Sequence, residues 1–514
     1  MMETLTNFSR SLGVVFSLWY DQEFWLTRFI FLRALGLIYL VAFLGVLFQF
    51  KGLFGRQGLL PAHLFLERVT ATYGSGIKAF WSLPTVFLIN ISDHFMAILA
   101  FLGVILSTAV LFGLSNGVSL FVLWVIYLSF VHVGQVFYGF GWESLLLETG
   151  FLAIFLYPFF NLNFFPIDHP PPKIIMFLLV WILFRNMFGA GLIKLRGDAS
   201  WKDLTALIYH FETQPLPNPL SPLFHALPKW MLKGGVLFNH FVELLVPIGL
   251  LLTAPFRMIA GIFTSVFQLI LIISGNLSWL NWLTLVLCIP CFDDRIWRRI
   301  LPASWLKSMP IEHHFGLYAF STQLVLVLLA VTIGILSINP IKNFFSSRQR
   351  MNSSYDPFHL VNSYGAFGSV GKKRYECIIM GTHDLNSDQW QPYEFVAKPG
   401  DVLRPHPIIA PYQPRLDWQI WFAAMGSYQQ HPWLVHLVYK LLQNDAEILA
   451  LMASNPFQDV PPKYIKIDLY EYQLAPLFSG RYWDRTYVSS YLPPLSLDNE
   501  SFLNYLNSYG WISR

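Results

Sequence analysis

The feature that most constrains this chain is an apolar run, residues 174–195, that carries charged side chains. The run is long enough to cross a bilayer, since about 20 helical residues span the hydrocarbon core. It nevertheless contains Arg185 and ends in the charged group Lys194, Arg196 and Asp198. An ionisable side chain in a membrane helix costs roughly 2.5–3.5 kcal/mol on insertion scales, so it normally faces protein or a water-filled cavity. Arg185 therefore predicts a bundle of membrane helices around it.

The composition agrees with a polytopic membrane protein. Of the 514 residues, 55% are hydrophobic and only 12% are charged, whereas soluble proteins average about 25% charged residues. The net charge of +4 is small and spread along the chain, so we expect no nucleic-acid partner. Three cysteines, Cys288, Cys291 and Cys377, cannot build a disulfide framework.

The chain divides into three parts. Residues 1–24 are polar and aromatic and predict an interfacial amino-terminal segment. Residues 25–340 hold the apolar runs of a multi-pass domain, and residues 343–514 have the composition of a soluble domain. The predicted fold class is a polytopic α-helical membrane domain followed by a soluble, β-rich α+β carboxy-terminal domain. The predicted spans are residues 25–50, 94–113, 118–138, 143–160, 174–195, 235–253, 256–275, 278–291 and 315–338.

Basic residues indicate the orientation. Arg28 and Arg33 lie near the start of the first span, and the loop 292–314 is rich in arginine. Positive residues favour the cytoplasmic side, so the last span would deliver the carboxy-terminal domain to the lumen or periplasm. Three residues that follow that span, Lys342, Arg348 and Arg350, favour the opposite orientation.

In the carboxy-terminal domain, residues 375–380, 393–397 and 464–470 alternate in the manner of strands. Glycine and proline separate them, above all in the proline-rich segment 404–414. Residues 432–454 predict one or two helices. The apolar face of this region is formed by Leu434, Leu437, Leu441 and Leu442.

A second apolar run contains two acids, Glu143 and Glu148, and Arg185 and Lys194 are their natural partners. The alternatives are that both acids lie among hydrated headgroups and that the lysine snorkels to the surface. If the helix continues past Leu195, Lys194 can pair with Asp198 one turn later. The predicted intramembrane polar cluster comprises Glu143, Glu148, Arg185, Lys194, Arg196, Asp198, His240 and Glu243.

Two further motifs could carry chemistry. His240 and Glu243 stand one turn apart, but a di-metal site needs several such turns, so we predict a hydrogen-bonded pair and no metal. Cys288 and Cys291 have redox-site spacing, although they close an apolar run instead of opening a helix after a strand. They are a candidate redox pair, with buried structural thiols as the alternative. A nucleophile elbow, a Walker loop and a zincin motif are absent.

Several long motifs resemble the lipase maturation factor family over residues 50–490. They include Phe140-Gly-Trp-Glu-Ser144, Gly189-Ala-Gly-Leu-Ile-Lys-Leu-Arg-Gly-Asp198, Tyr209-His-Phe-Glu-Thr-Gln-Pro-Leu-Pro-Asn218 and Arg415-Leu-Asp-Trp-Gln-Ile-Trp-Phe422. The resemblance implies a multi-pass endoplasmic-reticulum protein, or an inner-membrane protein in a bacterium, whose carboxy-terminal domain lies in the lumen. It also implies a chaperone-like factor that helps secreted lipases such as lipoprotein lipase to fold and assemble.

A shorter stretch, Gly191-Leu-Ile-Lys-Leu-Arg-Gly-Asp-Ala-Ser-Trp201, is similar to the Lys-Leu-Asp-Ala-Asp-Trp region of vitamin K-dependent γ-carboxylases. That similarity implies an alternative, a membrane enzyme or a lipid- or quinone-binding protein in which Lys194 acts as a base. A lysine beside apolar residues can have the lowered pKa that a general base requires. His210 and Glu212 would be further catalytic candidates.

Two hypotheses follow. In the first, the chain is a maturation factor without cofactor, in contact with membrane lipids and a secreted lipase client. Trp418 and Trp421 are then candidates for the client-binding surface. In the second, the polar cluster is a catalytic or lipid-binding pocket. A structural cluster should be fully paired, whereas a pocket should leave Lys194 facing an open cavity.

Overall fold

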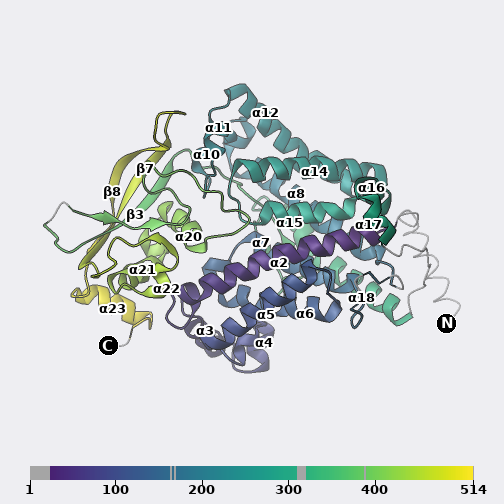
Figure 1. The fold of residues 1–514 in the computed structure, drawn as a ribbon, viewed down its shortest axis with the longest axis horizontal. Coiled ribbons are helices and arrows are strands. Elements are labelled where there is room, and N and C mark those ends of the chain that lie inside the picture. Colours follow the sequence, from purple (N-terminus) through teal and green to yellow (C-terminus); the bar gives the residue numbers. More distant parts are fainter. Residues whose placement is uncertain (1–22, 163–164, 167–168, 309–319, 387–388, 513–514) are drawn as a thin grey trace.

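The computed structural model describes residues 23–162, 165–166, 169–308, 320–386 and 389–512. Helices fill the centre and right of Figure 1, and the strands β3, β7 and β8 lie at its left end. The predicted fold class, a helical membrane domain followed by a β-containing domain, is confirmed. The predicted interfacial segment, residues 1–24, lies outside the described residues except for Glu23 and Phe24.

Within the described residues, six helices are long and apolar enough to cross a membrane. Two of them are composite: a π-helical turn joins α12 to α13, and α18 continues into α19. The apolar helices α6 and α15 are shorter. The long helices are α2 (Trp25–Phe54), α5 (Asp93–Leu111), α8 (Lys173–Gly197), α12 (Lys229–His240) with α13 (Val246–Leu250), α14 (Ala254–Ser274), and α18 (Phe320–Leu336) with α19 (Ile338–Phe345); the shorter pair are α6 (Gly117–Val133) and α15 (Leu280–Cys288).

Helix α7 (Gly141–Ala153) corrects the predicted span 143–160. At 1.5 Å per residue its 13 residues are about 20 Å long, too short to cross a bilayer. Every residue except Phe151 is buried. The helix is an interior one, so its two acids are enclosed by protein on all sides.

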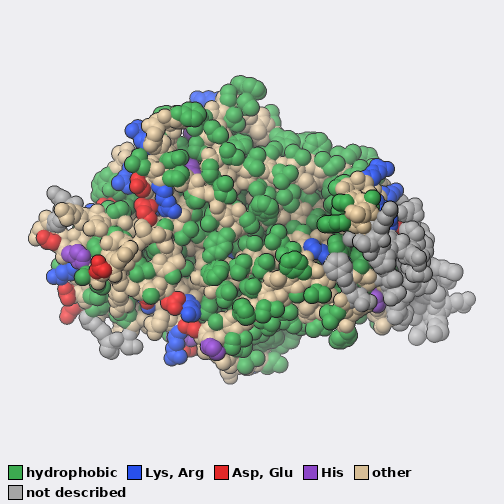
Figure 2. Space-filling view, in the orientation of Figure 1, with side chains coloured by type: hydrophobic (Ala, Val, Ile, Leu, Met, Phe, Trp, Pro, Cys, Tyr) green, Lys and Arg blue, Asp and Glu red, His purple; other side chains and the backbone are tan. Residues whose placement is uncertain are grey.

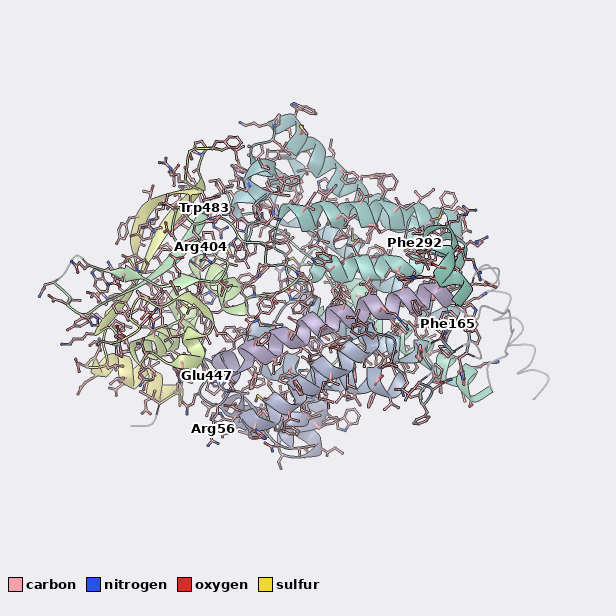
Figure 3. The ribbon with its side chains drawn as sticks, in the orientation of Figure 1. Arg56, Phe165, Phe292, Arg404, Glu447 and Trp483 are labelled. Atoms are coloured by element: carbon pink, nitrogen blue, oxygen red, sulfur yellow. The ribbon has the colours of Figure 1, made fainter. Side chains whose placement is uncertain are left out.

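Seven further helices connect the long ones or flank them. Of these, α16 lies at the start of α2, because the Asp294 carboxylate accepts hydrogen bonds from the N–H groups of Trp25 (2.9 Å) and Leu26 (3.0 Å). The other end of α2 meets the carboxy-terminal domain, where Gly52 lies against the backbone of Glu447. The arginine-rich loop and the carboxy-terminal domain therefore occupy opposite ends of α2, as the labels Phe292 and Glu447 mark in Figure 3. The seven helices are α3 (Ala62–Tyr73), α4 (Ile77–Ser82), α9 (Ala199–Lys202), α10 (Ala206–Thr213), α11 (Ser221–His225), α16 (Asp294–Ile300) and α17 (Ala303–Ser308).

An antiparallel sheet of order β4-β3-β7-β8 forms the carboxy-terminal domain. Helices α20 and α21 pack on its central strands. Two small ladders, β1–β2 and β5–β6, tie loops together. The strands are β1 (Ser353–Ser354), β2 (Asn362–Ser363), β3 (Arg374–Thr382), β4 (Gln391–Pro392), β5 (Glu394–Phe395), β6 (Met452–Ser454), β7 (Tyr464–Leu474) and β8 (Trp483–Leu495), and the helices are α20 (Arg415–Ala424), α21 (Pro432–Leu442), α22 (Ala446–Leu449) and α23 (Glu500–Ser508).

The strand predictions are correct in position for β3 and β7, but the predicted strand 393–397 is only the two-residue β5. Region 432–454 forms α21, α22 and the short strand β6, and the four predicted face leucines are buried. The longest strand, β8, and helix α20 are absent from the sequence-based prediction.

The surface over the helices is apolar. Figure 2 shows hydrophobic side chains over most of the central face, with charged groups gathered mainly at the two ends. Exposed large side chains such as Phe101, Ile105, Leu269 and Leu328 lie on α5, α14 and α18. In water such a patch would be unfavourable, whereas lipid tails solvate it. The chain is a multi-pass membrane protein.

Candidate functional site

Buried charges concentrate in the helical bundle and at its junction with the carboxy-terminal domain. In the part of the chain that the structure describes, four ion-paired groups are almost fully removed from solvent. Burying a charge is unfavourable unless hydrogen bonds and an opposite charge compensate it. The four groups are Glu148–Arg185, Lys194–Glu243, Glu143–Arg415 and Arg374–Glu376–Lys398.

Arg185 of α8 and Glu148 of α7 form a buried pair. The Arg185 guanidinium donates to both Glu148 carboxylate oxygens and to the Asn362 carbonyl oxygen at 2.7 Å. Glu148 also accepts from the Asn362 backbone N–H (3.1 Å) and the Tyr364 hydroxyl (2.6 Å). The segment that contains β2 therefore enters the bundle, where Asn362 and Tyr364 together donate three hydrogen bonds to this carboxylate.

Glu143 is paired with a residue of the carboxy-terminal domain. The Arg415 guanidinium, on α20, donates to the Glu143 carboxylate at 2.8 Å and to the Phe137 carbonyl at 2.7 Å. The Tyr127 hydroxyl donates to the other Glu143 oxygen. The Arg415 guanidinium also lies 3.3 Å from the centre of the Tyr138 ring. A single arginine thus links the turn Gln135–Tyr138, α7 and the carboxy-terminal domain.

Lys194 lies deep between α8 and the π-helical turn Phe241–Leu245. Its ammonium donates to the Glu243 carboxylate at 2.6 Å and to the Asn239 side-chain oxygen at 3.0 Å, and its side chain is 6% exposed. The Trp201 ring lies 4.8 Å away. This arrangement is the paired and enclosed one that a structural role requires. Gly191 permits it, because a Cβ there would lie 2.7 Å from Leu244.

The other residues of the predicted cluster are separated from these pairs. Helix α8 ends at Gly197, so Asp198 cannot pair with Lys194 and instead accepts from the N–H groups of Ser200 and Val370. Arg196 donates to Phe344 and Gln349. The expected His240–Glu243 pair is not formed, because a ring nitrogen of His240 contacts the Trp201 carbonyl oxygen and Glu243 binds Lys194.

The two further catalytic candidates, His210 and Glu212, contact residues other than Lys194. His210 is buried, and its ring packs against Phe367 with centroids 4.9 Å apart. The Glu212 carboxylate accepts from the Leu474 N–H at 2.8 Å. Glu212 therefore fixes the end of β7 to α10 and is not available as a partner of Lys194.

Sequence reasoning missed the triad Arg374–Glu376–Lys398. The Glu376 carboxylate lies 2.5 Å from the Arg374 guanidinium and 3.1 Å from the Lys398 ammonium. Arg374 also donates to the carbonyl oxygens of Glu212 and Pro215, both at 2.9 Å. The triad therefore anchors the sheet to the loop after α10. Arg374 immediately precedes the predicted strand 375–380 and Glu376 lies within it, and this is the only signal that the sequence offered.

One of the two predicted client contacts, Trp418, needs correction. Trp418 is buried and packs against Trp142, with ring centroids 5.1 Å apart, and against Phe140. Trp421 is partly buried, and its indole N–H donates to the Thr213 carbonyl oxygen at 3.2 Å. Both rings face the membrane domain, because α20 packs against it. Trp418 cannot be part of an exposed client-binding surface.

The three cysteines are free and buried. Cys288 and Cys291 lie at the end of α15, where the Cys291 Cβ fits against Gly261 of α14. Thiol–disulfide exchange requires an accessible thiolate. The geometry therefore favours structural thiols over a redox pair.

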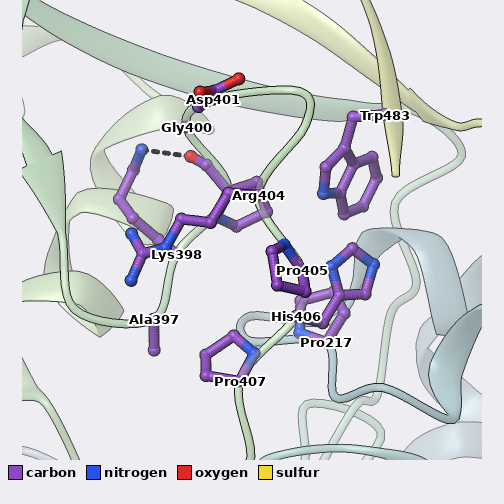
Figure 4. Close-up of a pocket in the computed structure, with 11 residues that line it drawn as sticks. Pro217, Ala397, Lys398, Gly400, Asp401, Arg404, Pro405, His406, Pro407 and Trp483 are labelled. Carbon is purple, nitrogen blue, oxygen red and sulfur yellow. Dashed lines mark hydrogen bonds between the residues drawn. The ribbon is translucent and has the colours of Figure 1, made fainter. Parts of the chain in front are cut away.

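Two cavities lie at the junction. The first holds about 10 Å³, room for a single water. In Figure 4 Pro217, from the loop after α10, lies among carboxy-terminal residues including His406, Lys398 and Trp483. The second, a cleft of about 190 Å³, contains His132 and Ser144 on one side and Asn352 and His359 on the other.

The cleft contains a Ser144–His359 contact of 3.1 Å between the hydroxyl oxygen and Nδ1. Desolvation lowers the pKa of His359 to about 3, and His132 nearby adds to this effect. An imidazole with so low a pKa is a weak base at neutral pH. Within the described ranges, histidine, cysteine and carboxylate side chains form no group of three or more that could hold a metal ion.

Comparison with known proteins shows that the chain matches two family models. Residues 26–299 match the lipase maturation factor transmembrane domain, and residues 360–493 match the lipase maturation factor C-terminal domain. No solved structure matches the chain. Asn362 and Tyr364, which bind Glu148, lie at the start of the C-terminal-domain match.

Full-length relatives give the same result. The chain is 43% identical to lipase maturation factor 1 of Mus musculus and 41% identical to that of Homo sapiens, over 95% of this chain and 90% of each relative. It is 31% identical to lipase maturation factor 2 of Rattus norvegicus, over 94% of this chain and 84% of the relative. The chain belongs to the lipase maturation factor family.

Proposed function

We propose that this chain assists the folding and assembly of secreted lipases, as a chaperone-like factor embedded in the endoplasmic-reticulum membrane. The observation that carries the proposal is the identity of 41–43% to proteins named lipase maturation factor 1 over 95% of the chain. The proposed partners are a lipase client and membrane lipids.

The buried contacts between the two domains support a role in which the carboxy-terminal domain is held rigidly to receive a client. Arg415 and Tyr364 bind membrane-domain carboxylates, and Arg374 binds carbonyl groups of the loop after α10. Such contacts hold the carboxy-terminal domain in one orientation relative to the bilayer. A client bound to that domain is thereby kept at a defined position beside the membrane.

The distribution of arginine supports a lumenal carboxy-terminal domain. Arg295, Arg298 and Arg299 belong to the loop beside the start of α2, at the end of the bundle opposite that domain. Positive residues favour the cytoplasmic side, and this tendency supports a lumenal position for the opposite end. Three basic residues near the carboxy-terminal domain, Lys342, Arg348 and Arg350, favour the opposite orientation. Arg348 and Arg350 follow α19, the end of the last membrane helix, and do not lie in a short loop between two spans.

The alternative, a lipid- or quinone-binding enzyme that uses Lys194, gains no support from the geometry. A general base must reach its substrate. The Lys194 ammonium is held by Glu243 and Asn239 and covered by Trp201.

Client rescue tests the proposal. The wild-type chain is expressed in cells that lack the endogenous factor, and secreted lipase activity is measured together with lipase protein. We expect activity to rise more than total lipase protein, because the factor acts on folding. Unchanged lipase activity, with the chain present in the membrane at normal abundance, would refute the proposal.

A further inference from the structure

Strand β8 (Trp483–Leu495) is an unusually long sheet edge. Its 13 residues exceed the usual strand length of about 5–6. In the described part of the chain it pairs only with β7, so its outer edge bears unpaired N–H and C=O groups. An unprotected edge of this kind is a template for another extended chain.

The edge is also uncovered on both faces. Side chains alternate between the two faces of a strand, yet all six residues 485–490 are exposed. The Trp483 N–H donates to the Val402 carbonyl oxygen. From residue 484 to residue 491, the described structure contains no backbone hydrogen bond other than those of the β7–β8 ladder. In Figure 1 the strand lies at the left margin, away from the transmembrane helices.

The opposite edge of the same sheet has two features that usually prevent the pairing of a further strand. Strand β4 has two residues, and one is Pro392, which lacks an N–H donor. In β8 Arg485 is the only charged residue from position 485 onward, and prolines occur only near its end, at Pro493 and Pro494. The stretch 486–492 contains only hydroxyl-bearing, aromatic and aliphatic side chains.

The register of the β7–β8 ladder limits the length of the segment that can pair continuously with the outer edge of β8. Residues 483–487 pair regularly with 474–470, and the ladder then shifts at Val488, at Tyr491 and between Leu492 and Leu495. Such bulges interrupt continuous pairing. A second copy of the chain paired over about five residues would bury far less than the roughly 1,000 Å² of a specific protein interface. A flexible peptide that adds a strand needs only a short regular run.

We propose that β8 is the client-binding edge, and that an extended segment of an incompletely folded lipase adds to it as a fifth strand. This inference rests on the proposed function, because a folding factor meets clients whose own strands are still unpaired. Tyr487 is 55% exposed and packs against Tyr470. It favours client segments rich in β-branched and aromatic residues, through cross-strand pairs.

The test combines edge-blocking variants with crosslinking. Thr486→Lys with Val488→Lys places two charges on exposed edge positions, and Leu385→Lys with Val460→Lys is the matched control at exposed positions outside the sheet. In the full-length chain a photo-crosslinking amino acid replaces Tyr487, or Val460 as control. We expect crosslinks to newly made lipase from position 487 only, and about tenfold less secreted lipase activity with the edge variant than with the control at equal abundance and thermal stability.

Normal maturation by the edge variant would overturn the inference, and so would crosslinks from position 487 to a second copy of this chain. If the wild type fails in client rescue, the proposed function fails. The edge is then judged with reduced, carboxymethylated α-lactalbumin as a permanently unfolded probe for the purified full-length chain. Crosslinking of this probe from position 487, and not from 460, supports strand addition, and its absence refutes it.

Discussion

The Glu143 carboxylate and the Arg415 guanidinium meet at 2.8 Å although 272 positions separate them in the chain. Both side chains are fully buried. An acid of the membrane domain is thus neutralised by the carboxy-terminal domain, so the two domains are not independent units. Removing residues 343–514 would leave Glu143 without Arg415, and Glu148 without Asn362 and Tyr364. Such a deletion therefore tests the folding of the whole chain and not only client binding.

The first prediction concerns this pair. Arg415→Met should destabilise the protein by about 3–5 kcal/mol, because it leaves an uncompensated buried carboxylate. Glu143→Gln together with Arg415→Met should recover most of that loss, since no charge then remains. Thermal unfolding in detergent measures both.

An exposed ion pair provides the control. Lys51 and Glu447 also join the two domains, 3.4 Å apart, and both are about half exposed. Lys51→Ala should change the free energy of unfolding by less than about 1 kcal/mol. A double variant at Glu143 and Arg415 as unstable as Arg415→Met would show that the charge is not the cause.

The second prediction separates structure from catalysis at Lys194. Lys194→Met leaves Glu243 charged and buried, so it should lower stability and abundance. Lys194→Met with Glu243→Gln removes both charges and should restore abundance and lipase maturation. The measurement is secreted lipase activity per molecule of membrane-inserted protein. A double variant that is abundant and stable yet inactive would favour the enzymatic alternative.

The third prediction concerns the close approach of α8 to the carboxy-terminal domain. A Cβ at Gly189 would lie 2.6 Å from the Tyr364 carbonyl oxygen, which cannot move without disturbing the hydroxyl bound to Glu148. Gly189→Ala should therefore cost about 1–3 kcal/mol. Gly234, inside α12, has no atom within 4 Å of such a Cβ, so Gly234→Ala should stabilise the helix by up to about 1 kcal/mol. Equal changes in melting temperature would contradict this contrast.

The positions of several membrane helices could be predicted from local sequence, because the length of an apolar run is enough to identify a membrane helix. The predicted span 94–113 is α5 (Asp93–Leu111), and 174–195 is α8 (Lys173–Gly197). The need of the buried acids for partners was also visible, and Arg185 was among the candidates for Glu148. What apolar length cannot reveal is an interior helix such as α7, which has the same composition as a span.

Pairing across the chain could not be predicted. Arg415 follows a proline-rich segment, and nothing in its neighbours indicates a carboxylate 272 positions away. Strand β8 was missed because Pro493 and Pro494 stand at its end and mask the alternation before them. Trp418 was a candidate for the client-binding surface, whereas its neighbours in the structure are Phe140 and Trp142 of the membrane domain.

The fourth prediction addresses the Cys-x-x-Cys segment. Cys288→Ala with Cys291→Ala should leave lipase maturation unchanged, because both thiols are buried and free. Maleimide should label Cys288 and Cys291 only after denaturation. Loss of maturation at normal abundance, or rapid labelling of the native protein, would support redox activity instead. Cys377 is buried on β3 and should behave like the other two.

The last prediction concerns pH and Asp417 of α20. Burial raises the pKa of this carboxyl from 3.8 to about 6, although the backbone N–H groups of Ala397 and Lys398 donate to it and partly oppose the shift. Between these two pKa values the folded state binds more protons than the unfolded state, so stability falls as pH rises. The contribution is fully present below about pH 4 and is lost above about pH 6. A shift of this size corresponds to roughly 3 kcal/mol.

Asp417→Asn keeps an acceptor for the two N–H groups but cannot ionise. Its stability relative to the wild type should therefore increase as pH rises from 4 to about 6.5, and then stay constant. Asp459→Asn, at an exposed position, is the matched control and should show no such trend. Thermal unfolding of the full-length proteins in detergent across this range gives the differences. The prediction is wrong if the stability difference between Asp417→Asn and the wild type does not change with pH. Asp417 would then be ionised in the folded protein throughout the range. The Lys398 ammonium, which lowers the pKa of Asp417, would compensate its charge.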